Sequence, residues 1–120
     1  MNDMSILILE DDTVVANAYA EALRNDGHEV TVCTGFEEAR DCLKGECPSA
    51  LLTDIRVRQY NGLQLALLFR EKCPDGKVVV VTGHDDRVIR NEVAALRADF
   101  LVKPISLAQL RNLFSPVRPS

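Results

Sequence analysis

Val78-Val79-Val80-Val81-Thr82-Gly83 is the most telling stretch of this sequence. Four consecutive β-branched residues predict a short strand, and because no polar residue alternates with them, both faces of that strand are expected to be buried. Strands of this kind are typical of parallel sheets that are covered by helices on both sides. Thr82 and Gly83 follow the valines, and a polar residue and a glycine at this point indicate that the strand ends there.

Four more short apolar runs rich in branched side chains lie at residues 6–9, 30–33, 50–53 and 100–102, and three of the five runs are continuous rather than alternating. Between and after the runs, apolar residues recur at the helical spacing of three and four positions, as in Val15, Ala18 and Ala22. Strict alternation of strand and helix predicts an α/β fold. Five strands fit a flavodoxin-like (βα)5 doubly wound fold, with a five-stranded parallel sheet in the order 2-1-3-4-5. Helix caps are predicted at Thr13, at Asp85 or Asp86, and at Ser106.

Length and composition predict one soluble domain over residues 1–120, with its core at about 5–114 and a loose tail at 115–120. Of the 120 residues 47% are hydrophobic, and the net charge is −4. An acidic balance argues against direct nucleic-acid binding. The chain has no run of about 20 apolar residues that could cross a membrane. Its acidic start lacks the positive region of a signal peptide, so we expect a cytoplasmic protein.

The cysteines are expected to be reduced thiols rather than disulfides, because they show no paired CxxC spacing and the chain has no export signal. The ordinary role of such a thiol is that of a small buried apolar side chain. The cysteines are Cys33, Cys42, Cys47 and Cys73.

Polar residues end four of the five apolar runs. They are Glu10-Asp11-Asp12, Asp54, Thr82 and Lys103. In an open parallel sheet these positions share one edge, the carboxyl ends of the strands, where such folds place their sites. Clustered carboxylates favour a hard divalent cation such as Mg²⁺. A metal ion and an ammonium group suit a phosphoryl group, and a carboxylate can be its nucleophile, which gives an aspartyl phosphate.

In these segments the sequence resembles the receiver domain of two-component response regulators. The matching segments are residues 8–12, 52–56, 61–63, 81–84 and 99–104. By position, the resemblance implies that Asp54 is the phosphoacceptor and that Lys103 pairs with it. Mg²⁺, with Mn²⁺ as an alternative, would be held by the carboxylates of Glu10, Asp11 and Asp54 and by the backbone carbonyl of Arg56. Thr82 would be the switch hydroxyl and Phe100 the switch aromatic. The Lys103-Pro104 peptide bond would be cis.

The implied function is that of a signalling domain in a phosphorelay, which is not an enzyme in its own right. A sensor histidine kinase or a histidine phosphotransfer protein would donate the phosphoryl group to Asp54. A second copy of the chain is a candidate partner at the face of the fourth helix, fifth strand and fifth helix, with rim charges at Arg90, Asp99 and Arg111.

Two other functions stay open. One is a receiver-like binding module that works without phosphorylation, which the complete set of acidic residues, Thr82 and Lys103 disfavours. The other is a phosphohydrolase of the haloacid dehalogenase kind, which wants a second aspartate where this chain has Arg56.

The sequence also departs from the family pattern. Arg58 replaces a frequent proline, and residues 95–100 lack the glycine that usually precedes the last strand. His28 and His84 are expected to be ordinary surface residues.

Overall fold

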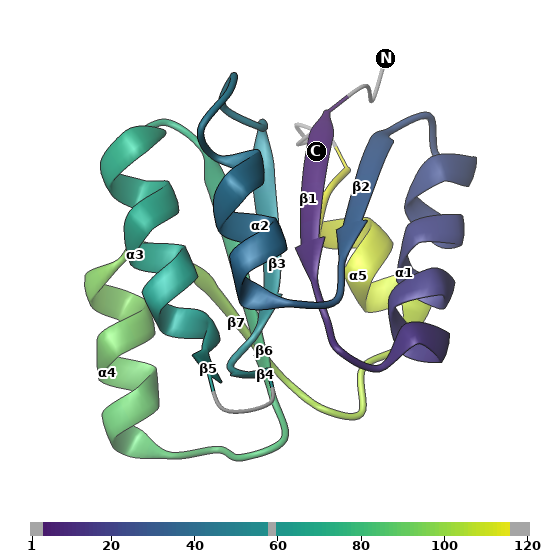
Figure 1. The fold of residues 1–120 in the computed structure, drawn as a ribbon. Helices are drawn as coiled ribbons and strands as arrows, with labels where there is room; N and C mark the ends of the chain where they lie inside the picture. Colours follow the sequence, from purple (N-terminus) through teal and green to yellow (C-terminus); the bar gives the residue numbers. More distant parts are fainter. Residues whose placement is uncertain (1–3, 58–59, 116–120) are drawn as a thin grey trace, which may run out of the picture.

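The protein is described by a computed structural model over residues 4–57 and 60–115. Its main sheet has five parallel strands in the order β2-β1-β3-β6-β7 (Figure 1). Since β6 and β7 are the fourth and fifth strands of this sheet along the chain, the predicted order is confirmed. The strands are β1 (Ser5–Leu9), β2 (Glu29–Cys33), β3 (Ala50–Asp54), β6 (Lys77–Thr82) and β7 (Asp99–Val102).

Helices cover both faces of the sheet. One face carries α1 (Thr13–Asn25) and α5 (Leu107–Leu113), and the other carries α2 (Phe36–Cys42), α3 (Gly62–Lys72) and α4 (Arg87–Ala95) (Figure 1). Each strand sends alternate side chains to the two faces. Thus Ile6 and Ile8 of β1 pack with α1 and α5, whereas Leu7 and Leu9 pack with α2 and α3. The continuous apolar runs therefore supply two cores at once.

A short antiparallel hairpin follows the central strand β3. It consists of β4 (Arg56–Val57) and β5 (Tyr60–Asn61), and the sequence did not predict it. Asn61 then caps α3, because its side chain accepts a hydrogen bond from the backbone amide of Leu63 at 2.8 Å. Arg58, which replaces the family's proline, lies outside the described residues, as does the predicted tail apart from Ser115.

The helix caps are close to the prediction. Asp86 and Ser106 cap α4 and α5 as expected. The cap of α1 is Asp12 and not Thr13, because the Asp12 carboxylate accepts hydrogen bonds from the amides of Val14 and Val15. Thr13 is instead the first residue of the helix.

Two further predictions are wrong. His28 is buried rather than solvated, since its Nδ1 accepts a hydrogen bond from the Met4 amide at 3.2 Å and its ring lies edge-on to Phe114. Cys47 and Cys73 form a disulfide, while Cys33 and Cys42 are free thiols as expected. The two bonded cysteines are 26 residues apart in the sequence, and only the packing of α3 beside the α2–β3 loop brings them together.

Within residues 4–57 and 60–115, no helix is both long and apolar enough to cross a lipid bilayer.

Candidate functional site

Asp54 is the last residue of β3 and lies at the carboxyl edge of the sheet. Only 8% of its surface is exposed. Its Oδ2 accepts a hydrogen bond from Lys103 Nζ at 2.6 Å, and its Oδ1 accepts one from the backbone amide of Arg56 at 3.1 Å. The carboxylate is therefore fixed in direction and already faces a cation.

Glu10 lies on the same edge, directly after β1, with 2% of its surface exposed. Its Oε1 accepts from Lys103 Nζ at 3.0 Å, and its Oε2 accepts from the backbone amide of Asp12 at 3.1 Å. Burial raises the pKa of Glu10, and the nearby Asp54 charge adds to that rise, whereas the hydrogen bonds from Asp12 and Lys103 oppose it. Two carboxylates thus share one ammonium in a poorly solvated place.

Lys103 follows β7, and its backbone amide donates to the Thr82 carbonyl at 2.7 Å. Burial works against its charged form, but the hydrogen bonds to Asp54 and Glu10 outweigh burial and raise the pKa of Lys103. Lys103 is therefore charged and aimed at the two carboxylates.

The Lys103-Pro104 peptide bond is cis, as predicted.

Thr82 ends β6, the strand next to β3, and it is 1% exposed. Its hydroxyl oxygen accepts a hydrogen bond from the His84 amide at 3.1 Å. Phe100 lies on β7, half-buried against the core under α4, and the Arg90 guanidinium lies 5.0 Å from the centre of its ring. The two predicted switch residues are thus on adjacent strands, with β6 between Phe100 and Asp54.

The predicted metal ligands are only partly assembled. Glu10 and Asp54 converge on Lys103, and Asp11 follows Glu10 with a half-buried side chain. Across the part of the chain that the structure describes, no three His, Cys, Asp or Glu side chains form a ready metal cluster. The donor set still fits Mg²⁺, because this ion binds through one or two protein carboxylates and keeps several waters.

Two residues beside Asp54 lie in the matching segments 61–63 and 52–56, but the sequence predicted no role for either of them. A Cβ atom on Gly62 would lie 1.8 Å from the Asp54 backbone oxygen, so only glycine fits there. The Thr53 hydroxyl donates to that same oxygen at 3.0 Å. A glycine directly after a turn and before a helix was the available sequence signal for Gly62, whereas nothing in the sequence singles out Thr53.

A groove of about 520 Å³ opens beside the site, between α1 and the segment that joins β7 to α5. Its lining includes Lys103 and two exposed apolar side chains, Val14 at 77% and Leu107 at 44% exposure. Apolar surface that adjoins a charged site is a feature of protein-binding surfaces. The remaining lining residues are Val15, Ala18, Tyr19, Pro104 and Ile105.

The three rim charges predicted for the α4–β7–α5 face all have partners. Arg90 pairs with Asp85, and Asp99 pairs with Lys77 at 3.1 Å. Arg111 pairs with Asp26 at the end of α1, at 2.8 Å. This bond directs Arg111 toward α1 instead of toward α4.

The comparisons with known proteins agree with this architecture. The family model described as "Response regulator receiver domain" matches residues 6–115. The chain is 26% identical over 114 residues to the photosynthetic apparatus regulatory protein RegA of Rhodobacter capsulatus. The aligned region covers 92% of this chain and 61% of RegA. It therefore spans less than two thirds of that regulator.

Two solved structures have the same fold. The CheY-like receiver domain protein of Methanospirillum hungatei JF-1 has a TM-score of 0.85 at 24% identity, covering 92% of this chain and 90% of that one. A response regulator protein of Burkholderia pseudomallei, solved with a phosphorylated aspartic acid, a calcium ion and citrate, has a TM-score of 0.85 at 22% identity, covering 94% and 67%. The family match spans nearly the whole chain, and this chain belongs to the response regulator receiver domains of two-component signalling.

Proposed function

We propose that Asp54 accepts a phosphoryl group from a phosphohistidine on a sensor histidine kinase or a histidine phosphotransfer protein. The observation that carries this proposal is the Asp54 carboxylate itself, which is nearly buried, fixed by the Arg56 amide and 2.6 Å from Lys103 Nζ. Such a carboxylate is held ready to attack a phosphorus atom. The phosphorylated aspartate in the Burkholderia pseudomallei regulator supports the same chemistry here.

A divalent cation, Mg²⁺ or Mn²⁺, would be held by Glu10, Asp11, Asp54 and the Arg56 carbonyl. When bound, it would neutralise charge on the phosphoryl oxygens. The oxygen donors and the burial of Glu10 fit this role, and the calcium ion in the Burkholderia pseudomallei regulator supports it. Lys103 would supply the second positive charge, since its ammonium already lies between the two carboxylates.

Thr82 and Phe100 would change conformation when Asp54 is phosphorylated. The Thr82 hydroxyl would gain a charge-assisted hydrogen bond to the phosphoryl group, a bond that exists only after transfer. A shift of Thr82 would change the packing space of Phe100 on the neighbouring strand. Because Phe100 has no hydroxyl, its position depends on packing and on the Arg90 guanidinium over its ring.

The groove beside Lys103 is the proposed docking place for the phosphodonor protein. Its lining combines the exposed Val14 and Leu107 with Lys103, whose Nζ donates a hydrogen bond to Asp54. A partner with an apolar helical surface could fill it and bring a phosphohistidine toward Asp54. The product of the reaction would then be a conformational signal on the α4–β7–α5 face.

Intact-mass measurement after incubation with acetyl phosphate tests the proposal. Wild-type protein should gain one phosphoryl group in the presence of Mg²⁺ and none in the presence of a chelator. Asp54→Ala should gain none, and Asp11→Asn should need clearly more Mg²⁺. Lys103→Ala should keep its fold, because this side chain is a site charge rather than part of the core.

Two results would contradict the assignment. A label of equal size on Asp54→Ala would place the acceptor elsewhere. A wild-type protein that takes no label from acetyl phosphate or from a phosphohistidine donor would favour the phosphorylation-independent binding module.

A further inference from the structure

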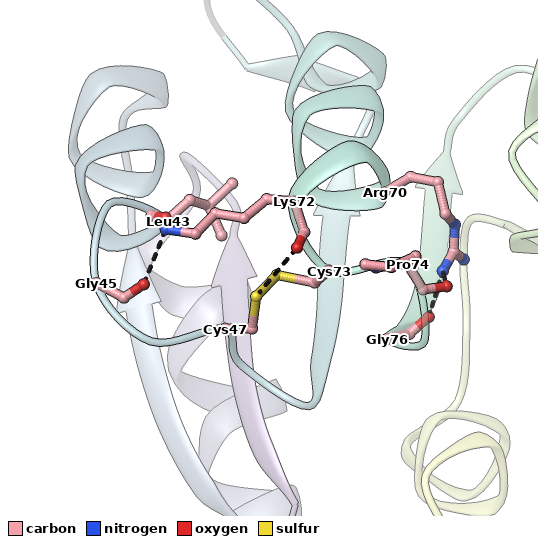
Figure 2. Close-up of a disulfide and its surroundings, with 8 residues drawn as sticks. All are labelled: Leu43, Gly45, Cys47, Arg70, Lys72, Cys73, Pro74 and Gly76. Atoms are coloured by element: carbon pink, nitrogen blue, oxygen red, sulfur yellow. Dashed lines mark hydrogen bonds between the residues drawn. A yellow bond between two sulfur atoms is a disulfide. The ribbon is translucent and has the colours of Figure 1, made fainter.

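The four cysteines form two pairs on the α2–α3 side of the sheet, and the proposed function uses neither pair. The Cys47–Cys73 disulfide joins the α2–β3 loop to the residue that follows α3, with Cα atoms 5.8 Å apart (Figure 2). Cys33 Sγ and Cys42 Sγ lie 3.8 Å apart as free thiols. One pair is therefore oxidised and the other is reduced within one small domain.

The two pairs differ in access. Cys47 is exposed at the surface, whereas Cys73 and Cys33 are buried. Burial also raises the pKa of the Cys33 thiol to about 12, together with the hydrogen bond to Cys42, so Cys33 is protonated and unreactive. Thiol–disulfide exchange needs an attacking thiolate to reach a disulfide sulfur. Cys47 is the sulfur of the bonded pair that an external thiol can reach.

The fold at this junction does not depend on the disulfide alone. Lys72 Nζ donates to the carbonyls of Leu43 and Gly45 in the α2–β3 loop, the second at 2.8 Å (Figure 2). Cys47 Sγ lies 3.5 Å from the Lys72 carbonyl oxygen, so a reduced Cys47 thiol has an acceptor in place. The junction can therefore stay assembled when the disulfide is opened, although with fewer constraints.

Arg70 supports the next turn in the same way. Its guanidinium donates to the carbonyls of Pro74 and Gly76 at 2.9 and 2.6 Å, which holds the α3–β6 turn (Figure 2). These bonds need no disulfide.

The junction is one end of the helix whose other end contacts the acceptor. α3 begins at Gly62, whose amide donates to the Ile55 carbonyl at 2.6 Å and whose Cα is packed against the Asp54 backbone. Figure 1 shows α3 running from the hairpin β4–β5 to the opposite end of the sheet. The disulfide thus constrains α3 at the end remote from Asp54.

We propose that the Cys47–Cys73 disulfide is a reversible modification site, through which a dithiol reductant loosens the C-terminal end of α3. A thiolate of the reductant attacks Cys47 Sγ, which forms a mixed disulfide and releases the Cys73 thiolate. The second thiol of the reductant then attacks its own sulfur in the mixed disulfide and releases the Cys47 thiolate. Two electrons pass to the protein, the reductant becomes a disulfide, and its two protons end on Cys47 and Cys73.

Thiol counting on the folded protein tests the chemistry. Dithiothreitol is added under native conditions, the reaction is quenched with acid, and the denatured protein is alkylated and weighed. The count should rise from the two free thiols of the structure to four. Cys42→Ser is the matched control, because it removes a thiol of the other pair and should show the same increase of two. A disulfide that opens only after denaturant is added would overturn the proposal.

Amide hydrogen exchange tests the consequence. In the reduced protein, exchange at residues 43–49 and in the last turn of α3 should be about tenfold faster or more, with β1 unchanged. Cys47→Ser should show the fast exchange with or without dithiothreitol. Equal exchange in the oxidised and reduced wild type would contradict the proposal, even if the variant failed to fold. Neither measurement depends on phosphorylation, so the result stands apart from the proposed function.

Discussion

At the scale of single residues, the site places two acidic side chains where solvation is poor. Glu10 and Asp54 are both nearly buried, and both accept hydrogen bonds from Lys103 Nζ. Burial of a carboxylate disfavours its charged form, and the single ammonium only partly offsets that cost for Glu10. Stability is thereby given up at the place where the proposed metal ion and phosphoryl group would bind.

The raised pKa of Glu10 makes the stability of the protein depend on pH. Protonation of the buried Glu10 favours the folded state. This contribution to stability is present in full below pH 4.5, the ordinary pKa of a glutamate, and is lost as the pH rises through the higher pKa of Glu10 in the folded protein. Glu10→Gln removes the charge and can keep an oxygen on the Asp12 amide, but it gives up the oxygen that accepts from Lys103. It should raise the free energy of unfolding at pH 7 relative to wild type, and this gain should shrink at pH 4, where Glu10 of the wild type is largely protonated. Urea unfolding at pH 4 and pH 7 measures the difference.

The control for this prediction is Glu29→Gln, which changes an exposed glutamate at the start of β2. It should leave the stability at pH 7 within about 0.5 kcal/mol of wild type. A Glu10→Gln protein that is less stable than wild type at pH 7 would show that the Lys103 ion pair outweighs the burial of Glu10.

At the scale of elements, α3 begins in direct contact with β3, the strand that ends at Asp54. A methyl group on Gly62 would lie 1.8 Å from the Asp54 carbonyl oxygen and 2.7 Å from Thr53 Oγ1. Since neither backbone atoms nor a buried hydroxyl can move away, Gly62→Ala should lower the free energy of unfolding by about 2–3 kcal/mol. It should also slow labelling by acetyl phosphate, because the acceptor strand must shift.

Gly83→Ala is the matched control, since nothing lies within 4 Å of a Cβ atom at that position. Its stability and labelling should stay close to wild type. Thermal unfolding and intact-mass kinetics on both variants compare the two glycines, and equal effects would argue against the close packing at Gly62.

The end of α4 shows how the chain accommodates the missing glycine before β7. Arg97 takes the left-handed conformation that glycine favours, with φ at 56°. A side chain there costs about 1–2 kcal/mol, part of which is offset by the smaller entropy of the unfolded chain. Arg97→Gly should therefore stabilise the protein by about 0.5–1 kcal/mol in urea unfolding.

Ala94→Gly provides the opposite control inside α4, where glycine should destabilise by up to about 1 kcal/mol. If Arg97→Gly were as destabilising as Ala94→Gly, the contacts of the Arg97 side chain would outweigh its backbone conformation.

At the scale of the whole molecule, the groove and the acceptor lie at the same end of the sheet. Val14 and Leu107 come from opposite parts of the sequence and line one apolar groove, whose lining also includes Lys103. Val14→Glu should slow phosphoryl transfer from a phosphohistidine protein about tenfold, because it places a charge in the proposed contact. Labelling by acetyl phosphate, which needs no docking surface, should be unchanged.

Leu67→Glu is the control for the docking prediction. Leu67 is 50% exposed but lies on α3, away from the groove. Equal slowing by both variants would show that the donor protein responds to net charge rather than to the groove.

Much of this architecture follows from local sequence. The runs 6–9, 50–53 and 78–81 form strands because branched apolar residues without alternation are stable only in a sheet covered on both faces. Their polar ends must then meet at one edge, which explains why the convergence of Glu10, Asp54 and Lys103 could be predicted. The helix caps at Asp86 and Ser106 are equally local, because each side chain bonds amides two or three residues further along the chain.

Tertiary packing decided the rest. Three features depend on contacts between different segments of the chain. They are the Cys47–Cys73 disulfide, the burial of His28 against Phe114 and the exclusion of a Cβ atom at Gly62. The partial assembly of the proposed metal ligands is also a tertiary result, since Lys103 reaches across neighbouring strands to form ion pairs with both Glu10 and Asp54. Periodicity and residue type indicate which secondary structure a segment prefers. The distances between segments depend instead on how the helices pack on the sheet.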